Sequence, residues 1–243
     1  LTGKRHSSWL KMMHGVDSIH VLSEWGKDML IRQRIDPKKI KLIKTAGSNK
    51  FKLKKKIPMK DGKLKLVFWG RCSPQKGIHL IIDALMMLEK ELPIRLDIYG
   101  PYWENNAYSR RLRNNIKNDR RIKICGNLPQ KKLLKKLQNY DLAVIPSIWM
   151  ETGPLTVLEA FAAGIPVAGT DLGGIRELLS NVKGCFTLPP ESKAWKQLFL
   201  KLLLNKKLLE DFIPPKHRSF SDLEKDLRVV ILNLLKINEQ KLN

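Results

Sequence analysis

Short apolar runs alternate with amphipathic stretches between residues 64 and 204, and this alternation constrains the fold more than any other feature of the sequence. The apolar runs lie at 64–69, 95–99, 121–125, 141–146, 166–170 and 185–188. The stretches with helical spacing lie at 77–91, 107–118, 130–139, 154–163, 173–180 and 193–204. Strands that alternate with helices form a parallel sheet covered by helices on both faces. The sequence therefore predicts an α/β, Rossmann-like doubly wound domain, with its ligand at the carboxyl ends of the strands.

The first 47 residues follow a different pattern. They predict one βαβ unit, with strands at 18–23 and 39–43 around a helix at 24–34. Such a unit is too small to bury its own core, so we interpret it as a remnant of a preceding domain. The expected boundaries are 1–47 for the end of that domain, 48–63 for a lysine-rich linker, 64–220 for the main domain and 221–243 for a C-terminal helix.

The C-terminal helix has a recognisable start and an apolar stripe. Ser221 fits the N-cap position, and Glu224 completes a capping box. The residues predicted to form its buried stripe are Leu223, Leu227, Val230 and Leu234.

The chain is strongly basic, because 46 lysines and arginines against 23 acidic residues give a net charge of +23. This charge predicts attraction to anionic partners. In the basic segment 131–137, KKLLKKL, three leucines form an apolar stripe and four lysines face water. A simply solvated helix face explains this pattern, and peripheral contact with an anionic membrane is the alternative. Aromatic residues do not interleave with the lysines, which argues against nucleic acid as a partner.

Two further features bear on cellular location. Cys72, Cys125 and Cys185 lie far apart and suit reduced thiols better than disulfides or a zinc site. The sequence contains no apolar run of the ~18–20 residues needed to span a bilayer. We therefore expect a cytoplasmic protein, with attachment to a membrane surface left open.

The segment 151–166, ETGPLTVLEAFAAGIP, follows the predicted strand 141–146 and should lie at the ligand-facing edge of the sheet. Its helix is apolar apart from Glu159. A buried carboxylate is unstable unless a partner satisfies it. Ligand hydroxyls, a buried arginine or a backbone amide would each serve as that partner.

Glu151 stands just before this helix, where an acidic side chain either caps the helix or contacts a ligand. Pro154 suits the first turn, and Gly153 allows a ligand to approach the backbone closely. The free amides of Leu155 and Thr156 would point at an anion, and the threonine adds a hydroxyl. The segment thus offers donors for phosphate and acceptors for sugar hydroxyls.

A second candidate segment, WGRCSPQKG at 69–77, follows the first strand of the main domain. Gly70 ends that strand, and Arg71 and Lys76 flank a Ser-Pro turn. Two cations at this position can neutralise a diphosphate, although they are also two of 46 basic residues. A third strand-to-helix turn, TDLGGIRE at 170–177, contains paired glycines, which alone are a weak signal.

These three turns, together with CGNLP at 125–129, resemble the C-terminal domain of the GT-B-fold retaining glycosyltransferases of family 4, the glycosyl transferases group 1. The resemblance covers most of 64–200. It rests on the order and spacing of the GRxxxxKG turn, the CGNLP turn, the E-x7-E pair Glu151/Glu159 and the GGIRE turn. Residues 16–47 also resemble the end of that family's N-terminal domain.

The resemblance implies a role for each matching residue. Arg71 and Lys76 would hold the diphosphate of a nucleotide-sugar, with Gly70 beside it. Glu151 would contact the transferred sugar and complete the catalytic set with these two cations, and Glu159 would bind the ribose hydroxyls. The other donor-binding residues would be Gly153, Pro154, Leu155 and Thr156 along the phosphate and sugar, and Asn127 and Leu128 near the base.

No metal or other cofactor is expected. The sequence lacks D-x-D, the carboxylate motif with which another class of transferases holds a metal. Arg71, Lys76 and a helix N-terminus would instead stabilise the leaving diphosphate electrostatically. The family's acceptor-binding half carries a histidine near the reaction centre. His6, His14 and His20 fall outside a recognisable match to it, and His79 fits a helix surface.

We therefore expect hexosyl transfer from a UDP-, GDP- or ADP-sugar to an acceptor, with retention of configuration. This chain would be mainly the donor-binding half and inactive alone. The acceptor stays unidentified, and the basic charge suits a lipid-linked one. One alternative is a non-catalytic nucleotide-sugar-binding module of GT-B type, and another is a Rossmann-like nucleic-acid binder driven by charge.

Overall fold

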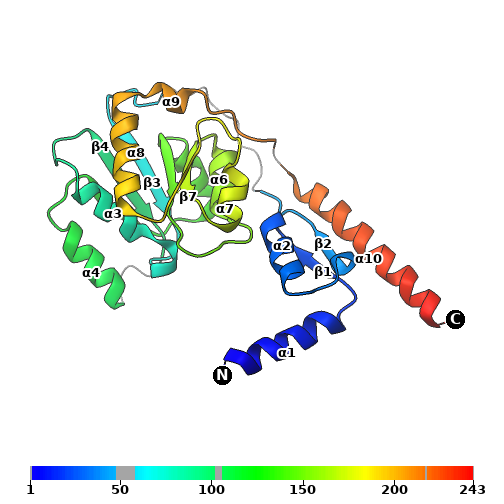
Figure 1. Cartoon of the computed structure of the whole chain (residues 1–243). Helices are drawn as coiled ribbons and strands as arrows, with labels where there is room; N and C mark the ends of the chain where they lie inside the picture. The colour runs from blue at the N-terminus through cyan, green and yellow to red at the C-terminus, as the bar shows by residue number, and fades with distance from the viewer. Residues whose placement is uncertain (1, 48–57, 102–105, 217, 243) are drawn as a thin grey trace. The chain divides into compact units, whose positions relative to one another are not determined.

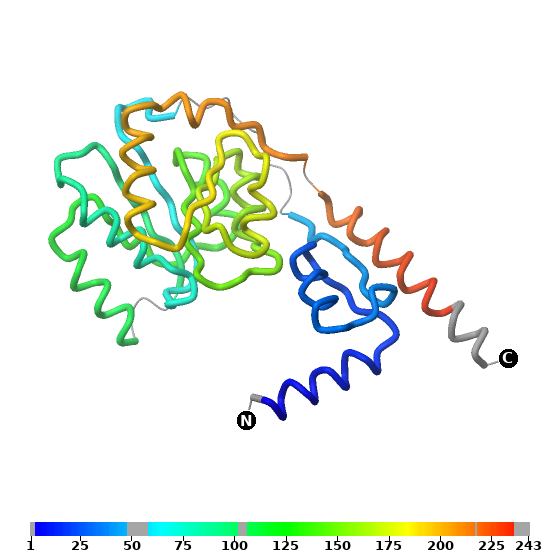
Figure 2. The backbone as a smooth tube through the Cα atoms, in the orientation of Figure 1, coloured from blue at the N-terminus to red at the C-terminus, as the bar shows by residue number. Residues whose placement is uncertain are grey.

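The computed structural model describes residues 2–47, 58–101, 106–216 and 218–242 (Figure 1). The chain divides into two compact units, one of residues 47–217 and one that joins residues 1–46 with 218–243. Figure 2 traces the backbone through both units. Most of the predicted linker, residues 48–57, lies outside the described residues.

The described part of the larger unit is built on a six-stranded parallel sheet with the order β5-β4-β3-β6-β7-β8. The strands are β3 (Leu64–Trp69), β4 (Ile94–Tyr99), β5 (Ile122–Gly126), β6 (Leu142–Ile145), β7 (Val167–Thr170) and β8 (Phe186–Leu188). Each strand coincides with a predicted apolar run to within one residue at either end. The predicted α/β fold with a doubly wound parallel sheet is confirmed.

Helices cover both faces of this sheet (Figure 1). On one face lie α3 (Ile78–Met86), α4 (Ala107–Ile116) and α8 (Ser192–Leu204), and on the other lie α5 (Gln130–Leu137), α6 (Leu155–Ala163) and α7 (Gly173–Leu179). The short helices η2 (Pro74–Lys76) and α9 (Lys207–Glu210) complete the unit. Along β3, Leu66 and Phe68 enter the first core, whereas Val67 and Trp69 enter the second, because successive strand residues point to opposite faces.

Helix α3 ends at Met86, short of the predicted end at residue 91. The guanidinium of Arg121 accounts for the difference, because it donates to the carbonyls of Leu85 and Leu88. A cation is favourable at these last carbonyls of a helix. Asp119 balances the charge with an ion pair of 2.7 Å, and both side chains are buried.

The smaller unit contains the predicted βαβ arrangement. Its elements are α1 (Thr2–Gly15), β1 (Ile19–Val21), α2 (Glu24–Arg32), η1 (Pro37–Lys39), β2 (Ile40–Leu42) and α10 (Phe220–Leu242). Strands β1 and β2 are parallel, and the α2 helix connects them. Leu30, Ile35 and Ile40 form its small buried core. Helix α1 was not predicted.

Helix α10 begins differently from the prediction. The capping box of Ser221 and Glu224 is wrong: the Ser219 amide donates to the Asp222 carboxylate at 2.9 Å, and the Asp222 amide donates to Ser219 Oγ at 3.2 Å. Ser219 and Asp222 are three residues apart, like the predicted Ser221 and Glu224, but lie two residues earlier in the chain. The hydrogen bonds from Ser219 lower the pKa of Asp222. The predicted buried stripe of α10 is only half-buried, because no other described element packs closely along it.

Candidate functional site

The two segments with most of the predicted site residues lie where the strand order of the sheet reverses. From β3 the sheet extends through β4 to β5, and the chain then crosses to β6 on the other side of β3. In parallel sheets, such a reversal leaves a crevice at the carboxyl ends of the two strands, and ligands bind there. The turn at 70–77 follows β3 and the loop at 146–154 follows β6, so both begin at this crevice.

Gly77 allows this turn and this loop to pack closely. Its φ is +67°, and a Cβ at this position would lie 1.8 Å from the carbonyl oxygen of Pro146. Any other residue would combine an unfavourable backbone conformation with a steric clash. The Ile148 amide also donates to the Gln75 carbonyl at 2.9 Å. The two segments are therefore held together, and the side chain of Lys76 reaches over the loop.

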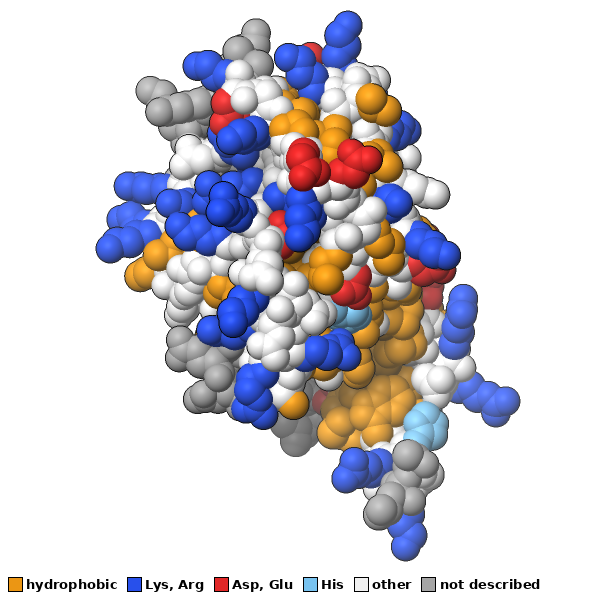
Figure 3. Space-filling view, turned by 90° about the vertical axis from the view of Figure 1, so that its left-hand side faces the viewer, with side chains coloured by type: hydrophobic (Ala, Val, Ile, Leu, Met, Phe, Trp, Pro, Cys, Tyr) orange, Lys and Arg blue, Asp and Glu red, His pale blue; other side chains and the backbone are white. Residues whose placement is uncertain are grey.

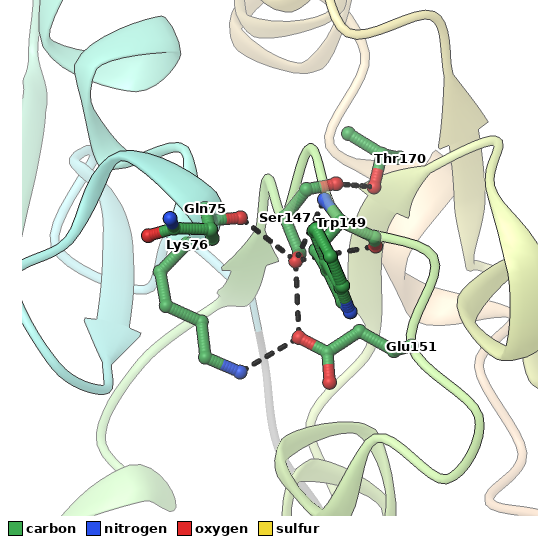
Figure 4. A network of polar contacts seen from close by, with 6 residues as sticks. All are labelled: Gln75, Lys76, Ser147, Trp149, Glu151 and Thr170. Carbon is green, nitrogen blue, oxygen red and sulfur yellow. Dashed lines mark hydrogen bonds and ion pairs between the residues drawn. The ribbon is translucent and has the colours of Figure 1, made fainter. Parts of the chain in front are cut away.

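Lys76 and Glu151 form an ion pair at this position (Figure 4). The distance from Lys76 Nζ to Glu151 Oε1 is 2.6 Å, and the side chains are 29% and 19% exposed. Ser147, which is buried, lies with its Oγ 3.0 Å from the same carboxylate oxygen and 3.0 Å from the Gln75 carbonyl. The Thr170 hydroxyl donates to the Ser147 carbonyl at 2.5 Å and fixes the backbone beneath it. Glu151 is thus oriented by a cation and a hydroxyl.

The alternative role of Glu151 as a helix cap is wrong. The N-terminus of α6 receives no side-chain hydrogen bond, and its N-cap residue is Pro154. The Val157 amide donates to the Pro154 carbonyl at 3.1 Å, whereas the amides of Leu155 and Thr156 make none of the described hydrogen bonds and remain available to a ligand. Near them, Gly153 and Thr156 are half-buried, and Leu155 is exposed.

Glu159 is buried in α6, as its apolar surroundings predicted, but its carboxylate already has partners. The Trp69 indole donates to Oε2 at 2.7 Å, and the Gln130 amide donates to Oε1 at 2.7 Å. The sequence correctly indicated that this carboxylate needs a partner, but the partners in the structure are an indole and a side-chain amide, which were not among the three alternatives, so a ligand is not needed to satisfy it. Each carboxylate oxygen has more than one lone pair, so both can still accept hydroxyl donors.

The paired glycines of the third turn support the loop that carries Glu151. The Gly174 amide donates to the Glu151 carbonyl at 2.6 Å, and a Cβ on Gly174 would lie 2.7 Å from that oxygen. A Cβ on Gly173 would meet the same oxygen at 2.9 Å. Only residues without side chains fit against the loop, which gives a physical reason for a motif that is weak by sequence alone.

The remaining predicted residues lie on the turns around this crevice. Gly70 follows β3 with a φ of +152°, and Arg71 is exposed and pairs with none of the described carboxylates. Asn127 is exposed after β5, and Leu128 packs partly against the core beneath α5. Only Lys76 and Glu151 among the predicted site residues bond to each other through their side chains in the described part of the chain.

Trp69, Gln130 and Ser147 were missed in the sequence. Trp69 is the last residue of a strand, Gln130 begins a helix and Ser147 follows a strand. Polar groups at the carboxyl ends of parallel strands are the signal that could have identified them. Trp69 and Gln130 lie 90 and 29 residues from their partner Glu159, so these two contacts depend on the fold, whereas Ser147 lies 4 residues from its partner Glu151 on the same loop.

The amphipathic basic segment is confirmed as α5. Its three leucines are buried and its four lysines are exposed. Figure 3 faces the side on which α4 lies and shows Lys and Arg side chains protruding over much of that surface. Within the described residues, none of the α5 lysines forms an ion pair.

Among the residues with described positions, no three His, Cys, Asp or Glu side chains come close enough to hold a metal ion. The expectation of a metal-free site stays a prediction. None of the described helices combines the length and the apolar character needed to cross a bilayer.

Residues 49–217 match the family model described as "Glycosyl transferases group 1", which is more than half of the chain. The chain belongs to this family. The glycosyl transferases group 1 domain corresponds closely to the larger unit and contains all the predicted site residues. The resemblance inferred from the four turns is confirmed.

Relatives in this family are longer than the chain. An uncharacterised glycosyltransferase from Methanocaldococcus jannaschii is 29% identical over 161 residues, which cover 63% of this chain and 40% of the relative. Glycogen synthase from Mycobacterium tuberculosis is 32% identical over 123 residues, which cover 50% of this chain and 29% of the relative. The chain thus aligns with less than half the length of each of these two proteins.

Solved structures show the same GT-B fold. HepE from Anabaena, in complex with UDP and glucose, superposes with a TM-score of 0.73 at 18% identity over 89% of this chain and 63% of HepE. Its complex with UDP-glucose gives the same TM-score over 90% of this chain and 64% of HepE. TarM matches with a TM-score of 0.71 at 21% identity and covers 91% of this chain and 45% of TarM. These likenesses extend beyond the larger unit.

Proposed function

We propose that this chain binds a nucleotide-sugar and forms the donor-binding half of a hexosyltransferase that retains the anomeric configuration. The observation that carries the proposal is the ion pair of Lys76 and Glu151 at the sheet crevice, beside the uncapped N-terminus of α6. A cation and open helix amides suit a diphosphate, and an oriented carboxylate suits sugar hydroxyls. The complexes of HepE with UDP and glucose and with UDP-glucose support this ligand class.

The diphosphate would lie between Lys76, Arg71 and the first turn of α6. Lys76 is held by Glu151 at 2.6 Å, and Arg71 is exposed and free of described carboxylates. A bound diphosphate would share the ammonium of Lys76 and recruit the guanidinium of Arg71. These groups would stabilise the negative charge that develops on the departing diphosphate, without a metal.

The nucleoside would lie on the Glu159 side of the crevice. The carboxylate of Glu159 is fixed by Trp69 and Gln130 and retains lone pairs for ribose hydroxyls. Gln130 is the first residue of α5 and follows the turn of Asn127 and Leu128, which comes after β5 and would border the base. The transferred hexose would then lie nearer Glu151 and the backbone from Gly153 to Thr156.

The acceptor half of the reaction is proposed to lie mostly outside this chain. Residues 1–47 would be the end of the acceptor-side domain, 48–63 the linker, 64–220 the donor domain and 221–243 a C-terminal helix. Because the chain aligns with only 40% of its relative from M. jannaschii, we expect this chain alone to bind the donor and to transfer little sugar. A non-catalytic nucleotide-sugar-binding module is the second candidate, and rapid donor turnover by the chain alone would contradict it.

A cytoplasmic location belongs to the same proposal. The three cysteines are unpaired, as expected where thiols stay reduced. The exposed lysines of α5 would bring the protein to an anionic membrane, where a lipid-linked acceptor is available. Nucleic acid is not part of this proposal.

Calorimetric titration with UDP-glucose, GDP-mannose and ADP-glucose tests the donor site. We expect one of them to bind, and Glu159→Gln to weaken it by about tenfold or more through loss of charged hydrogen bonds to the ribose. Glu191→Gln, which changes an exposed carboxylate of the same unit, is the matched control. Absence of binding by all three sugars would refute the function, and unchanged binding by Glu159→Gln would refute the assignment of that residue.

A further inference from the structure

Three consecutive apolar side chains are exposed on the loop between β6 and α6. Ile148 is 42% exposed, Trp149 64% and Met150 44%. A run of three exposed apolar residues is unusual on a folded domain unless it serves a function. The run ends immediately before Glu151, so it borders the candidate site.

Ile148 and Met150 pack against neighbouring turns, whereas Trp149 does not. A methyl group of Ile148 lies 3.4 Å from the position of a Cβ on Gly77, and so packs against the β3 turn. The Met150 backbone lies 3.2 Å from the corresponding position on Gly173. Trp149 is the most exposed of the three, and its indole takes part in none of the described ring contacts.

The backbone of Trp149 is nevertheless held firmly. Its amide lies 3.4 Å from Ser147 Oγ, its carbonyl accepts from the Glu151 amide at 2.9 Å, and the preceding amide of Ile148 donates to Gln75 at 2.9 Å. Figure 4 shows the indole beside the Glu151 carboxylate, which Lys76 reaches from another direction. An exposed aromatic ring on a pre-ordered loop binds a ligand with little loss of loop entropy.

We propose that Trp149 covers one face of the hexose carried by the nucleotide-sugar and thereby determines selectivity for the hexosyl group. This inference rests on the proposed function of the site. A hexopyranose presents C–H groups on its faces and hydroxyls on its edge, so an aromatic ring can cover a face while polar groups bind the edge. The Glu151 carboxylate lies beside the indole and Lys76 bonds to it from the other side, so Glu151 would contact the hydroxyls and Lys76 the adjoining diphosphate, which makes the donor hexose the fitting occupant.

The test compares a nucleotide with and without its sugar. The dissociation constants of UDP and UDP-glucose are measured by calorimetry for the parent chain, Trp149→Ala and Trp149→Phe. Because UDP lacks the hexose, its affinity should not change, whereas Trp149→Ala should weaken UDP-glucose by about tenfold. Trp149→Phe should retain most of the affinity for UDP-glucose. Met86→Ala, which removes a 49% exposed side chain at the last residue of α3, is the matched control.

The outcomes separate this inference from the function on which it rests. If Trp149→Ala weakens UDP and UDP-glucose equally, the indole contacts the nucleotide and the inference is wrong. If both affinities stay unchanged, the indole serves another occupant, such as the acceptor, and the inference is also wrong. If the parent chain binds neither of these ligands, the measurement is repeated with GDP and GDP-mannose and with ADP and ADP-glucose. Failure of all three pairs to bind would refute the proposed function and the inference together.

Discussion

Lys76 and Glu151 are separated by 75 residues in the sequence and by 2.6 Å between their charged atoms. The pair joins the segment after β3 to the segment after β6, at the reversal of the strand order. Both side chains are partly shielded from water, which strengthens the attraction between the ammonium and the carboxylate. In the proposed function, a bound diphosphate would pair with the ammonium of Lys76, and the carboxylate of Glu151 would then be free to bind a sugar hydroxyl.

Lys76→Met should therefore affect ligand binding more than folding. We expect the affinity for UDP or the preferred nucleoside diphosphate to fall by about tenfold to a hundredfold, because a charged hydrogen bond to phosphate is lost. Lys90→Met removes an exposed lysine from the same unit and should leave the affinity unchanged. Calorimetry on both variants measures the difference, and equal affinities would argue against Lys76 as a phosphate ligand.

Gly77→Ala should destabilise the larger unit. The new Cβ would lie 1.8 Å from the Pro146 carbonyl oxygen, at a φ of +67°. Gly62→Ala is a matched control, because Gly62 has a φ of +74° and nothing within 4 Å of its Cβ position. Strain alone should cost about 1 kcal/mol of unfolding free energy in the control, and the clash should add roughly 2 kcal/mol or more at Gly77. Urea denaturation of both variants measures these costs, and similar values would mean that the turn moves away from Pro146 easily.

The sheet could be predicted because its signal is local. The inner strands β3, β6 and β7 are short apolar runs that are buried on both faces, and a helix follows every strand of this sheet. The helix ends were predicted less well, because they depend on contacts from elsewhere. Helix α3 ends where Arg121 binds its last carbonyls, and Arg121 is separated from α3 along the chain by β4 and α4. The sequence of residues 77–91 alone therefore could not indicate this end.

The sequence predicted which turns form the site, but it did not predict which side chains in those turns contact one another. Glu159 stood out because it is a single carboxylate in an apolar helix, but its partners Trp69 and Gln130 come from a strand and a helix that only the fold brings together. For Glu151, the sequence allowed capping and ligand binding equally; the structure excludes capping and pairs the carboxylate with Lys76, and ligand binding stays a prediction. Local patterns therefore located the site, whereas its hydrogen bonds required the topology.

His79 should make the stability of the protein depend on pH. It is half-buried on α3, and its Nδ1 lies 2.8 Å from Tyr108 Oη on α4, so it is partly covered by that helix. Burial lowers the pKa of His79, Arg111 acts in the same direction and Asp83 opposes them. The unfolded chain should protonate this histidine near its ordinary pKa of about 6.5, before the folded chain does. The contribution of His79 to the free energy of unfolding is thus complete above that pH, and it decreases as the pH falls towards the folded-state pKa.

His79→Asn should remove this part of the pH dependence. Asparagine does not titrate and can still hydrogen-bond to Tyr108, so the loss of unfolding free energy between about pH 7.5 and pH 5.5 should be smaller than in the parent. His14→Asn, at an exposed position on α1, should leave the parent profile unchanged. Urea denaturation at both pH values measures the effect, and identical profiles for His79→Asn and the parent would contradict it.

The basic face of α5 should bind anionic membranes. The leucines of this helix are buried in the core, so the attraction comes from its exposed lysines and should be sensitive to salt. The variant changes Lys131, Lys132, Lys135 and Lys136 to glutamine, and its control changes the exposed Lys4, Lys11, Lys183 and Lys206. At about 1 kcal/mol per lysine near the surface, the α5 variant should lose at least tenfold in binding to phosphatidylglycerol vesicles by sedimentation. The control should bind like the parent because its lysines are dispersed, and neither should bind phosphatidylcholine vesicles. Equal loss in both variants would mean that overall charge, and not α5, attracts the protein to the membrane.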